Sequence, residues 1–195
     1  MASLEIPLFP LNTVLFPGGV LPLRIFEPRY LDMVKRCMRD ASEFGVLLIR
    51  DGHEAEHRVE VVSVGTLTQI VDFDQLPDNL LGITTRGTRR FRVIEQRVQE
   101  DGLHLAKIEL LALDPCVPLP EEFERYARLL EQALPQMGDF FKHLQPRYDD
   151  AAWVSGRLAE VVPIPLDEKQ RILEMDDPLE RLQVLQPLIR GTAAN

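Results

Sequence analysis

The chain has 195 residues, of which 45% are hydrophobic and 27% are charged, and its formal net charge is −9. These proportions are typical of an ordinary globular protein and exclude a disordered or fibrous chain. The acidic surplus argues against a nucleic-acid-binding protein, because such modules usually carry a surplus of basic residues.

The stretch from residue 6 to residue 30 sets prolines among large apolar side chains. The prolines are Pro7, Pro10, Pro17, Pro22 and Pro28. Each proline fixes φ and removes a backbone donor, so this stretch is predicted to form short extended pieces joined by rigid bends. The turn signal at residues 17–19 predicts a tight reversal that lets residues 14–16 and 20–26 pack side by side.

A helix is predicted over residues 28–40. Pro28 stands at a favoured first helical position, and Glu27 before it is a candidate cap. The apolar side chains that recur at helical spacing are Tyr30, Val34, Cys37 and Met38. We expect this helix to lie across a sheet and to bury that stripe.

The middle of the chain reads as an antiparallel meander. Residues 45–50 form a short apolar run that fits a buried strand, and residues 59–73 are rich in β-branched residues. Gly65 within that run predicts a bulge or a close backbone approach. Turn signals at residues 78–79, at Gly87 and at residues 101–102 predict three hairpin turns. These turns separate strands over 80–85, 88–98 and 103–113.

Strand alternation stops at a proline-rich segment, residues 116–120, and helical spacing follows. Helices are predicted from Glu121 to a break near Pro135, over residues 151–162 after the cap Asp150, and over residues 166–175. The last helix has the clearest start. Asp177 is its cap, Pro178 takes its first position, and Gly191 is expected to stop it.

Three stretches in this order resemble the Lon N-terminal domain family, the substrate-recognition domain of the ATP-dependent protease Lon, in its stand-alone form. They are the PLFPLN, VLFPG and LPLRIFEPRYLDMV strings of residues 7–34, residues 64–93 and residues 155–185. The resemblance implies a PUA-like β-barrel followed by a helical subdomain. Strands first and helices afterwards independently indicate an α+β fold.

We therefore predict an α+β fold with an N-terminal PUA-like antiparallel β-barrel, one covering helix and a C-terminal helical bundle. The predicted domains are a barrel subdomain over 1–115, a proline-rich linker over 116–120 and a helical subdomain over 121–191.

Residues 53–57 read HEAEH, the pattern in which two histidines one helical turn apart bind zinc and the glutamate activates water. Here the pattern follows a turn and leads within two residues into a strand pattern. The candidates for a third ligand lack distinctive spacing; they are Asp72, Asp74 and His104. We interpret His53 and His57 as incidental and predict no metal and no cofactor.

No catalytic residue is predicted. The sequence lacks the Gly-rich phosphate cradle of an ATPase and the GxSxG elbow of a hydrolase, and neither Cys37 nor Cys116 has the context of an activated thiolate.

Two cysteines give no disulfide framework, so we expect a reducing, cytoplasmic location. No apolar run approaches the roughly 20 residues that span a bilayer, and the N-terminus lacks a basic segment, so neither a membrane span nor a signal peptide is expected.

The function predicted from the resemblance is non-catalytic binding of unfolded or hydrophobic polypeptide segments, or of a partner protein, with a link to protein quality control or proteolysis. The predicted binding residues are Phe26, Tyr30 and Met33, in an apolar groove between the barrel and the helical part; plain core packing is the alternative for all three. The alternative function is RNA binding through the PUA-like barrel, by a basic cluster at the predicted turn around Gly87 and on the strand that follows it. The cluster consists of Arg86, Arg89, Arg90 and Arg92. A solvated strand face is the competing interpretation of that cluster.

Overall fold

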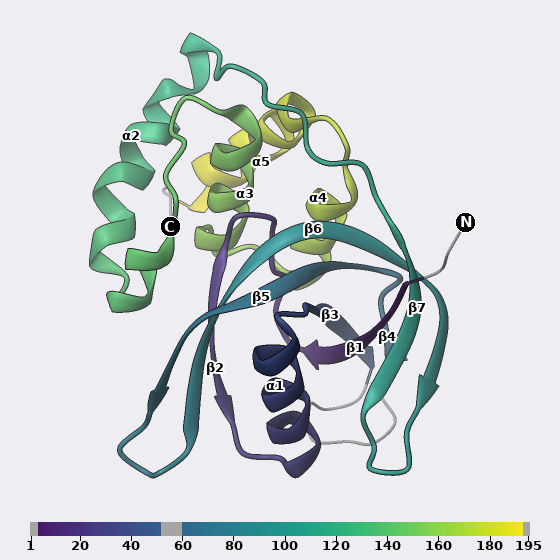
Figure 1. Cartoon of the computed structure of the whole chain (residues 1–195). Coiled ribbons are helices and arrows are strands. Elements are labelled where there is room, and N and C mark those ends of the chain that lie inside the picture. Colours follow the sequence, from purple (N-terminus) through teal and green to yellow (C-terminus); the bar gives the residue numbers. More distant parts are fainter. Residues whose placement is uncertain (1–3, 52–59, 193–195) are drawn as a thin grey trace. The chain divides into compact units, whose positions relative to one another are not determined.

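The computed structural model describes residues 4–51 and 60–192, and the chain divides after Ala112 into two compact units. The first unit is a sheet with one helix, and the second is helical (Figure 1). The fold is therefore α+β, with a mostly antiparallel sheet plus helices, as predicted. The predicted linker, residues 116–120, lies within the second unit, where Leu119 N donates to Asp149 O.

The sheet of the first unit contains every described strand. The elements of this unit are β1 (Leu4–Leu11), β2 (Val20–Ile25), α1 (Pro28–Asp40), β3 (Phe44–Asp51), β4 (Glu60–Val61), β5 (Val64–Gln75), β6 (Leu81–Val98) and β7 (His104–Leu110). The strand order is β1-β7-β6-β5-β3-β4, and β2 pairs with β6. β1 also pairs with β3 in parallel, so the pairings among β1, β7, β6, β5 and β3 close into a ring.

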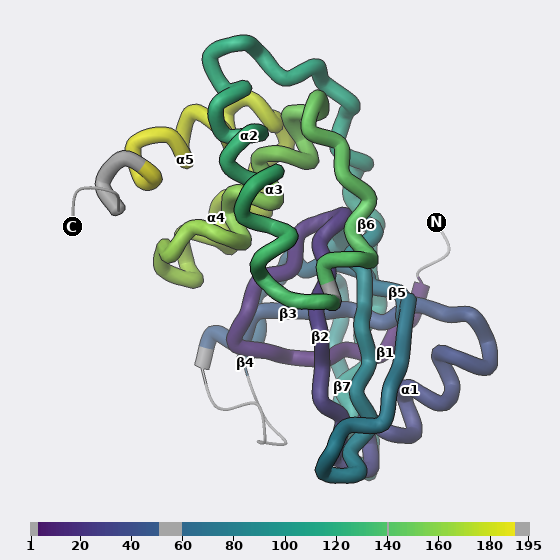
Figure 2. The backbone as a smooth tube through the Cα atoms, turned by 90° about the vertical axis from the view of Figure 1, so that its left-hand side faces the viewer, coloured from purple at the N-terminus to yellow at the C-terminus, as the bar shows by residue number. Residues whose placement is uncertain are grey.

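Helix α1 packs one face into this sheet. Its buried side chains Tyr30, Met33, Val34 and Cys37 belong to one core cluster with residues of β1, β2, β3, β6 and β7. The ring of Tyr30 stacks on that of Phe9, with centroids 3.9 Å apart. Figures 1 and 2 show α1 beside the long arm that β2, β5 and β6 form. The helix covers the sheet as predicted, but Glu27 makes no side-chain capping bond, because its carboxylate pairs with the buried Arg29.

The opening stretch folds differently from the prediction. Residues 14–16 form no strand, and β2 pairs with β6, so the two predicted pieces do not pair with each other. The turn at residues 17–19 does exist, because Gly19 N donates to Phe16 O. That turn docks on β6 instead: Gly18 N donates to Gly87 O, and Gly87 N donates to Gly19 O.

The predicted turn at Gly87 is therefore wrong, because β6 runs unbroken through it for 18 residues. A Cβ atom on Gly87 would lie 2.5 Å from the carbonyl oxygen of Phe16. Gly87 marks a close approach between a strand and a turn. A glycine in the sequence is the same signal for a hairpin turn and for such a close approach. The other two hairpin turns are confirmed, with Asn79 and Gly102 at positive φ.

The second unit begins with a 3-10 turn, η1 (Glu121–Phe123), that leads into α2 (Glu124–Ala133). Two 3-10 turns follow, η2 (Leu134–Gln136) and η3 (Asp139–His143), and then α3 (Ala151–Val161), α4 (Leu166–Glu174) and α5 (Pro178–Thr192). The start signals are confirmed: the Asp150 side chain accepts from Ala152 N, and the Asp177 side chain accepts from Leu179 N. α5 continues through Gly191, which was expected to stop it.

A buried ion pair fixes the start of α5 inside the second unit. Arg181 donates two bonds to Asp114, at 2.8 and 2.9 Å, and its Nε donates to Met175 O. The Arg181 side chain is 1% exposed.

Within residues 4–51 and 60–192, no helix is both long enough and apolar enough to cross a membrane.

Candidate functional site

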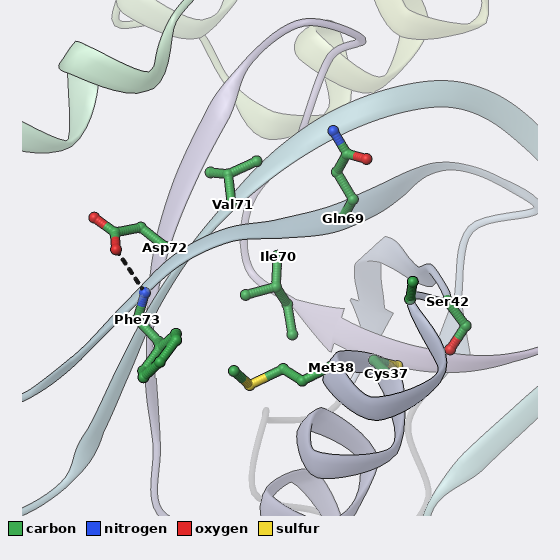
Figure 3. A pocket seen from close by; sticks show the side chains of 9 residues that line it. Cys37, Met38, Ser42, Gln69, Ile70, Val71, Asp72 and Phe73 are labelled. Carbon is green, nitrogen blue, oxygen red and sulfur yellow. Dashed lines mark hydrogen bonds between the residues drawn. The ribbon is translucent and has the colours of Figure 1, made fainter.

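A hollow of about 350 Å³ opens in the first unit between the end of α1 and the middle of β5 (Figure 3). Its lining residues come from these two elements and from the turn after the helix. They are Cys37, Met38, Ala41, Ser42, Gln69, Ile70, Val71, Asp72 and Phe73.

The end of α1 determines one wall of this hollow. Ala41 has the left-handed conformation, φ 48°, and its N–H and that of Ser42 both donate to Cys37 O. This is the geometry that closes a helix and redirects the chain. The backbone then enters β3 at Phe44, so the last turn of α1 stays uncovered on the side of β5.

Apolar side chains meet across the opening. Met38 projects from α1 toward Ile70 of β5, and Phe73 lies farther along the same strand (Figure 3). Met38 is 41% exposed and Phe73 is 60% exposed, whereas Ile70 packs partly against the core cluster. Large apolar side chains that remain exposed around a hollow are typical of a surface that binds a hydrophobic partner.

Cys37 lies on the inner side of the hollow but is only 3% exposed. Burial raises the pKa of its thiol, which opposes the thiolate form that a nucleophile needs. Among the described residues, no group of three or more His, Cys, Asp or Glu side chains is placed to hold a metal ion. This surface can therefore bind a partner through apolar contacts and backbone hydrogen bonds.

The three predicted binding residues do not share one surface. Phe26 is 62% exposed, just before α1, whereas Tyr30 is 3% exposed and Met33 is 0% exposed, both within the core cluster. Tyr30 and Met33 are closed to solvent in this conformation. The role of all three in binding stays a prediction.

Sequence reasoning missed Met38 and Phe73 as surface residues. Met38 was placed in the buried stripe of α1, but the stripe is Tyr30, Met33, Val34 and Cys37. Met38 lies at the margin of that face, one residue beyond Cys37, where helical spacing is ambiguous. Phe73 is an aromatic residue between two aspartates, Asp72 and Asp74, and this context was the available signal that it is not a core residue.

The basic cluster on β6 is not one open face. Arg90 is 2% exposed, and Arg89 donates its Nε to Leu111 O at 2.6 Å, whereas Arg92 is exposed. The histidine pattern at residues 53–57 lies outside the described residues.

A family profile described as the ATP-dependent protease La (LON) substrate-binding domain matches residues 5–191. Among curated proteins, Lon protease of Anaeromyxobacter dehalogenans is 27% identical over 192 residues, and that of Escherichia coli K12 is 26% identical over 201 residues. The alignments cover 94% and 96% of this chain but 23% and 25% of those relatives, so the chain spans about a quarter of their length.

Solved structures agree with this result. A Lon N-terminal domain protein from Xanthomonas campestris is 39% identical, with a TM-score of 0.77 over 94% of this chain and 98% of that chain. The N-terminal domain of the Mycobacterium avium complex Lon protease is 18% identical, with a TM-score of 0.59 over 94% of this chain and 97% of that chain. The second likeness concerns the fold alone. The alternative prediction of RNA binding gains no support from these relatives.

Proposed function

The chain belongs to the family of the ATP-dependent protease La (Lon) substrate-binding domain, and from that premise we propose that it is a non-catalytic module that binds unfolded or hydrophobic polypeptide segments in proteolytic quality control. The observation that carries this proposal is the exposed apolar surface around the hollow, formed by Met38, Ile70 and Phe73. Apolar area buried there contributes about 25 cal/mol per Å², before the cost of ordering the bound segment.

The residues predicted from sequence enter this proposal in two ways. Phe26 offers a second exposed apolar ring just before α1, apart from the residues that line the hollow. Tyr30 and Met33 act from the core by fixing the position of α1, which presents Met38. The PUA-like barrel remains part of the proposal, supported by the closed ring of strand pairings.

Binding to a permanently unfolded protein, reduced and alkylated at its cysteines, tests the proposed function. Phe73→Ser is expected to weaken this binding about tenfold, because it removes a large exposed aromatic ring that lines the hollow. Ile94→Ser is the matched control, since Ile94 is 61% exposed on β6 but does not line the hollow. Equal loss in both variants, or no binding by the unaltered protein, would refute the proposal.

Phe26→Ser extends the same assay to the residue predicted from sequence. The expected loss is about threefold, with no change in thermal stability, because the ring is largely in solvent already. Unchanged binding would remove Phe26 from the proposed surface and leave the hollow unaffected.

A further inference from the structure

β5 is longer than one of its two neighbours. On one side it pairs with β6 along its length, from Val64 to Gln75. On the other side it pairs with β3 only at Thr66, Leu67 and Thr68. In the part of the chain that the structure describes, no strand pairs with this second edge of β5 beyond Thr68.

The main-chain donors of this free edge can be assigned. Along a strand, successive N–H groups point to opposite edges. Leu76 N donates across the hairpin to Leu80 O at 2.9 Å, so it faces β6. Gln75 N and Phe73 N lie one and three residues earlier, and therefore face the free edge.

Both of these donors are held by the side chain of the residue before them. Phe73 N donates to Asp72 Oδ1 at 3.0 Å (Figure 3), and Gln75 N donates to Asp74 Oδ1 at 2.8 Å. Each carboxylate thus occupies a position that a carbonyl oxygen of a neighbouring strand would otherwise take. Charged side chains along an edge also suppress unselective strand pairing.

The hollow lies along this same edge. Because Phe44 of β3 pairs with Thr68 in antiparallel register, a strand that continued β3 backwards would pair with Gln69 and the residues after it. The chain instead turns away at Ser42 into α1, and the hollow of about 350 Å³ occupies that place. Met38, on its far side, faces β5 across this space.

We propose that the free edge of β5, from Gln69 to Gln75, accepts an extended polypeptide segment as an additional strand. Carbonyl oxygens of the segment replace the carboxylates of Asp72 and Asp74 on Phe73 N and Gln75 N. Alternate side chains of the segment, preferably apolar, enter the hollow beside Met38 and Ile70. Lysine or arginine in the segment pairs with the displaced carboxylates.

This inference rests on the proposed function and states how recognition works there. Main-chain pairing provides affinity without demanding a particular sequence, which suits a module that binds many unfolded segments. The partner is therefore defined by its chemistry: an extended segment with free main-chain groups, apolar residues at alternate positions and positive charge between them.

N-methylated peptides test the pairing directly. The probe is a short fluorescent peptide of alternating valine and lysine, together with two versions that are N-methylated on either all valines or all lysines. In an added strand, only one of these sets of N–H groups faces β5. One methylated peptide is expected to bind about tenfold more weakly than the unmodified peptide, and the other within about threefold of it.

The possible failures are distinguishable in this assay. If the unmodified peptide binds and both methylated versions bind equally, the edge pairing is wrong while the proposed function stands. If neither the unmodified peptide nor an unfolded protein binds, the proposed function fails and the inference fails with it.

Two variants of one residue test the protein side. Phe73→Ala removes the ring but keeps the N–H donor, whereas Phe73→Pro removes both. Proline is tolerated where a strand donor faces away from its partner, so both variants are expected to fold. Phe73→Pro should bind the unmodified peptide about tenfold more weakly than Phe73→Ala. Equal affinities of the two variants would overturn the inference. It would also be overturned if the unaltered protein formed a concentration-dependent dimer, if Phe73→Pro were monomeric and if no peptide bound, because the edge would then pair with a second copy of this chain.

Discussion

At the scale of single residues, two methionines of α1 separate stability from binding. Met33 is 0% exposed in the core cluster, and Met38 is 41% exposed beside the hollow. We expect Met33→Ala to lower the free energy of unfolding by about 2–5 kcal/mol, and Met38→Ala by less than about 1 kcal/mol. Urea denaturation measures both, with unfolded-protein binding measured below the transition. The assignment fails if Met38→Ala proves the more destabilising change or leaves binding intact.

The two cysteines, like the two methionines, differ in their exposure to solvent. Cys37 is buried and Cys116 is exposed, and burial raises the pKa of the Cys37 thiol, so that thiol stays protonated to higher pH. Iodoacetamide at mildly alkaline pH is expected to label Cys116 alone, as read by peptide mass spectrometry.

Cys116→Ser should leave the folded protein unlabelled, and urea should expose Cys37 to the reagent. The folded-state pKa of the Cys37 thiol is raised above its unfolded pKa of about 9. The buried thiol therefore contributes fully to the free energy of unfolding below the unfolded pKa, and this contribution declines as the pH rises through the folded-state pKa. Rapid labelling of Cys37 under native conditions would contradict this picture.

At the scale of elements, Gly65 ties β5 to β3. A Cβ atom there would clash with the carbonyl oxygen of Val46 and lie 2.7 Å from a methyl group of Leu47. A backbone carbonyl cannot move without breaking the β3–β5 pairing, so Gly65→Ala should cost about 2–4 kcal/mol. Thermal unfolding checks this, with Gly82→Ala as control, because a Cβ there meets the flexible side chain of Leu76 at 3.0 Å and lies at an ordinary 3.5 Å from the carbonyl oxygen of Asp74. A smaller loss at Gly65 than at Gly82 would be inconsistent with this assignment.

Sequence patterns predicted the elements better than their pairings. The caps Asp150 and Asp177 and the close approach at Gly65 follow from rules that act over a few residues, and the structure confirms them. The docking of the Gly18–Gly19 turn on Gly87 joins residues far apart in sequence, and no local rule predicts it.

The candidate site depends on the same non-local geometry. Met38 is exposed because the chain turns at Ala41, and the edge of β5 is free because β3 begins at Phe44. Helical periodicity gave most of the buried face of α1 but could not give the space between α1 and β5. For this reason the residues predicted for binding were Phe26, Tyr30 and Met33, and Met38 and Phe73 were not among them.

At the scale of the whole molecule, the net charge of −9 acts on the approach of any partner. An acidic protein attracts cationic segments over a Debye length of about 10 Å at 0.1 M salt, and this steering affects association more than dissociation. The association rate constant of a lysine-rich unfolded probe is therefore expected to fall several-fold between about 0.02 and 0.5 M salt. Its dissociation rate constant should change less than the association rate constant, because apolar contacts and main-chain bonds hold the bound segment and its exposed ion pairs contribute little.

A glutamate-rich probe of the same length provides the control in stopped-flow measurements. Its association should accelerate with salt, because screening removes a repulsion. The same field opposes RNA, so a structured RNA should bind weakly at all salt concentrations. Tight RNA binding that falls steeply with salt would instead indicate phosphate contacts and would reverse the choice between the two functions. If salt acts on the lysine-rich probe mainly by accelerating dissociation, ion pairs hold that segment in place, and the apolar hollow contributes less than proposed.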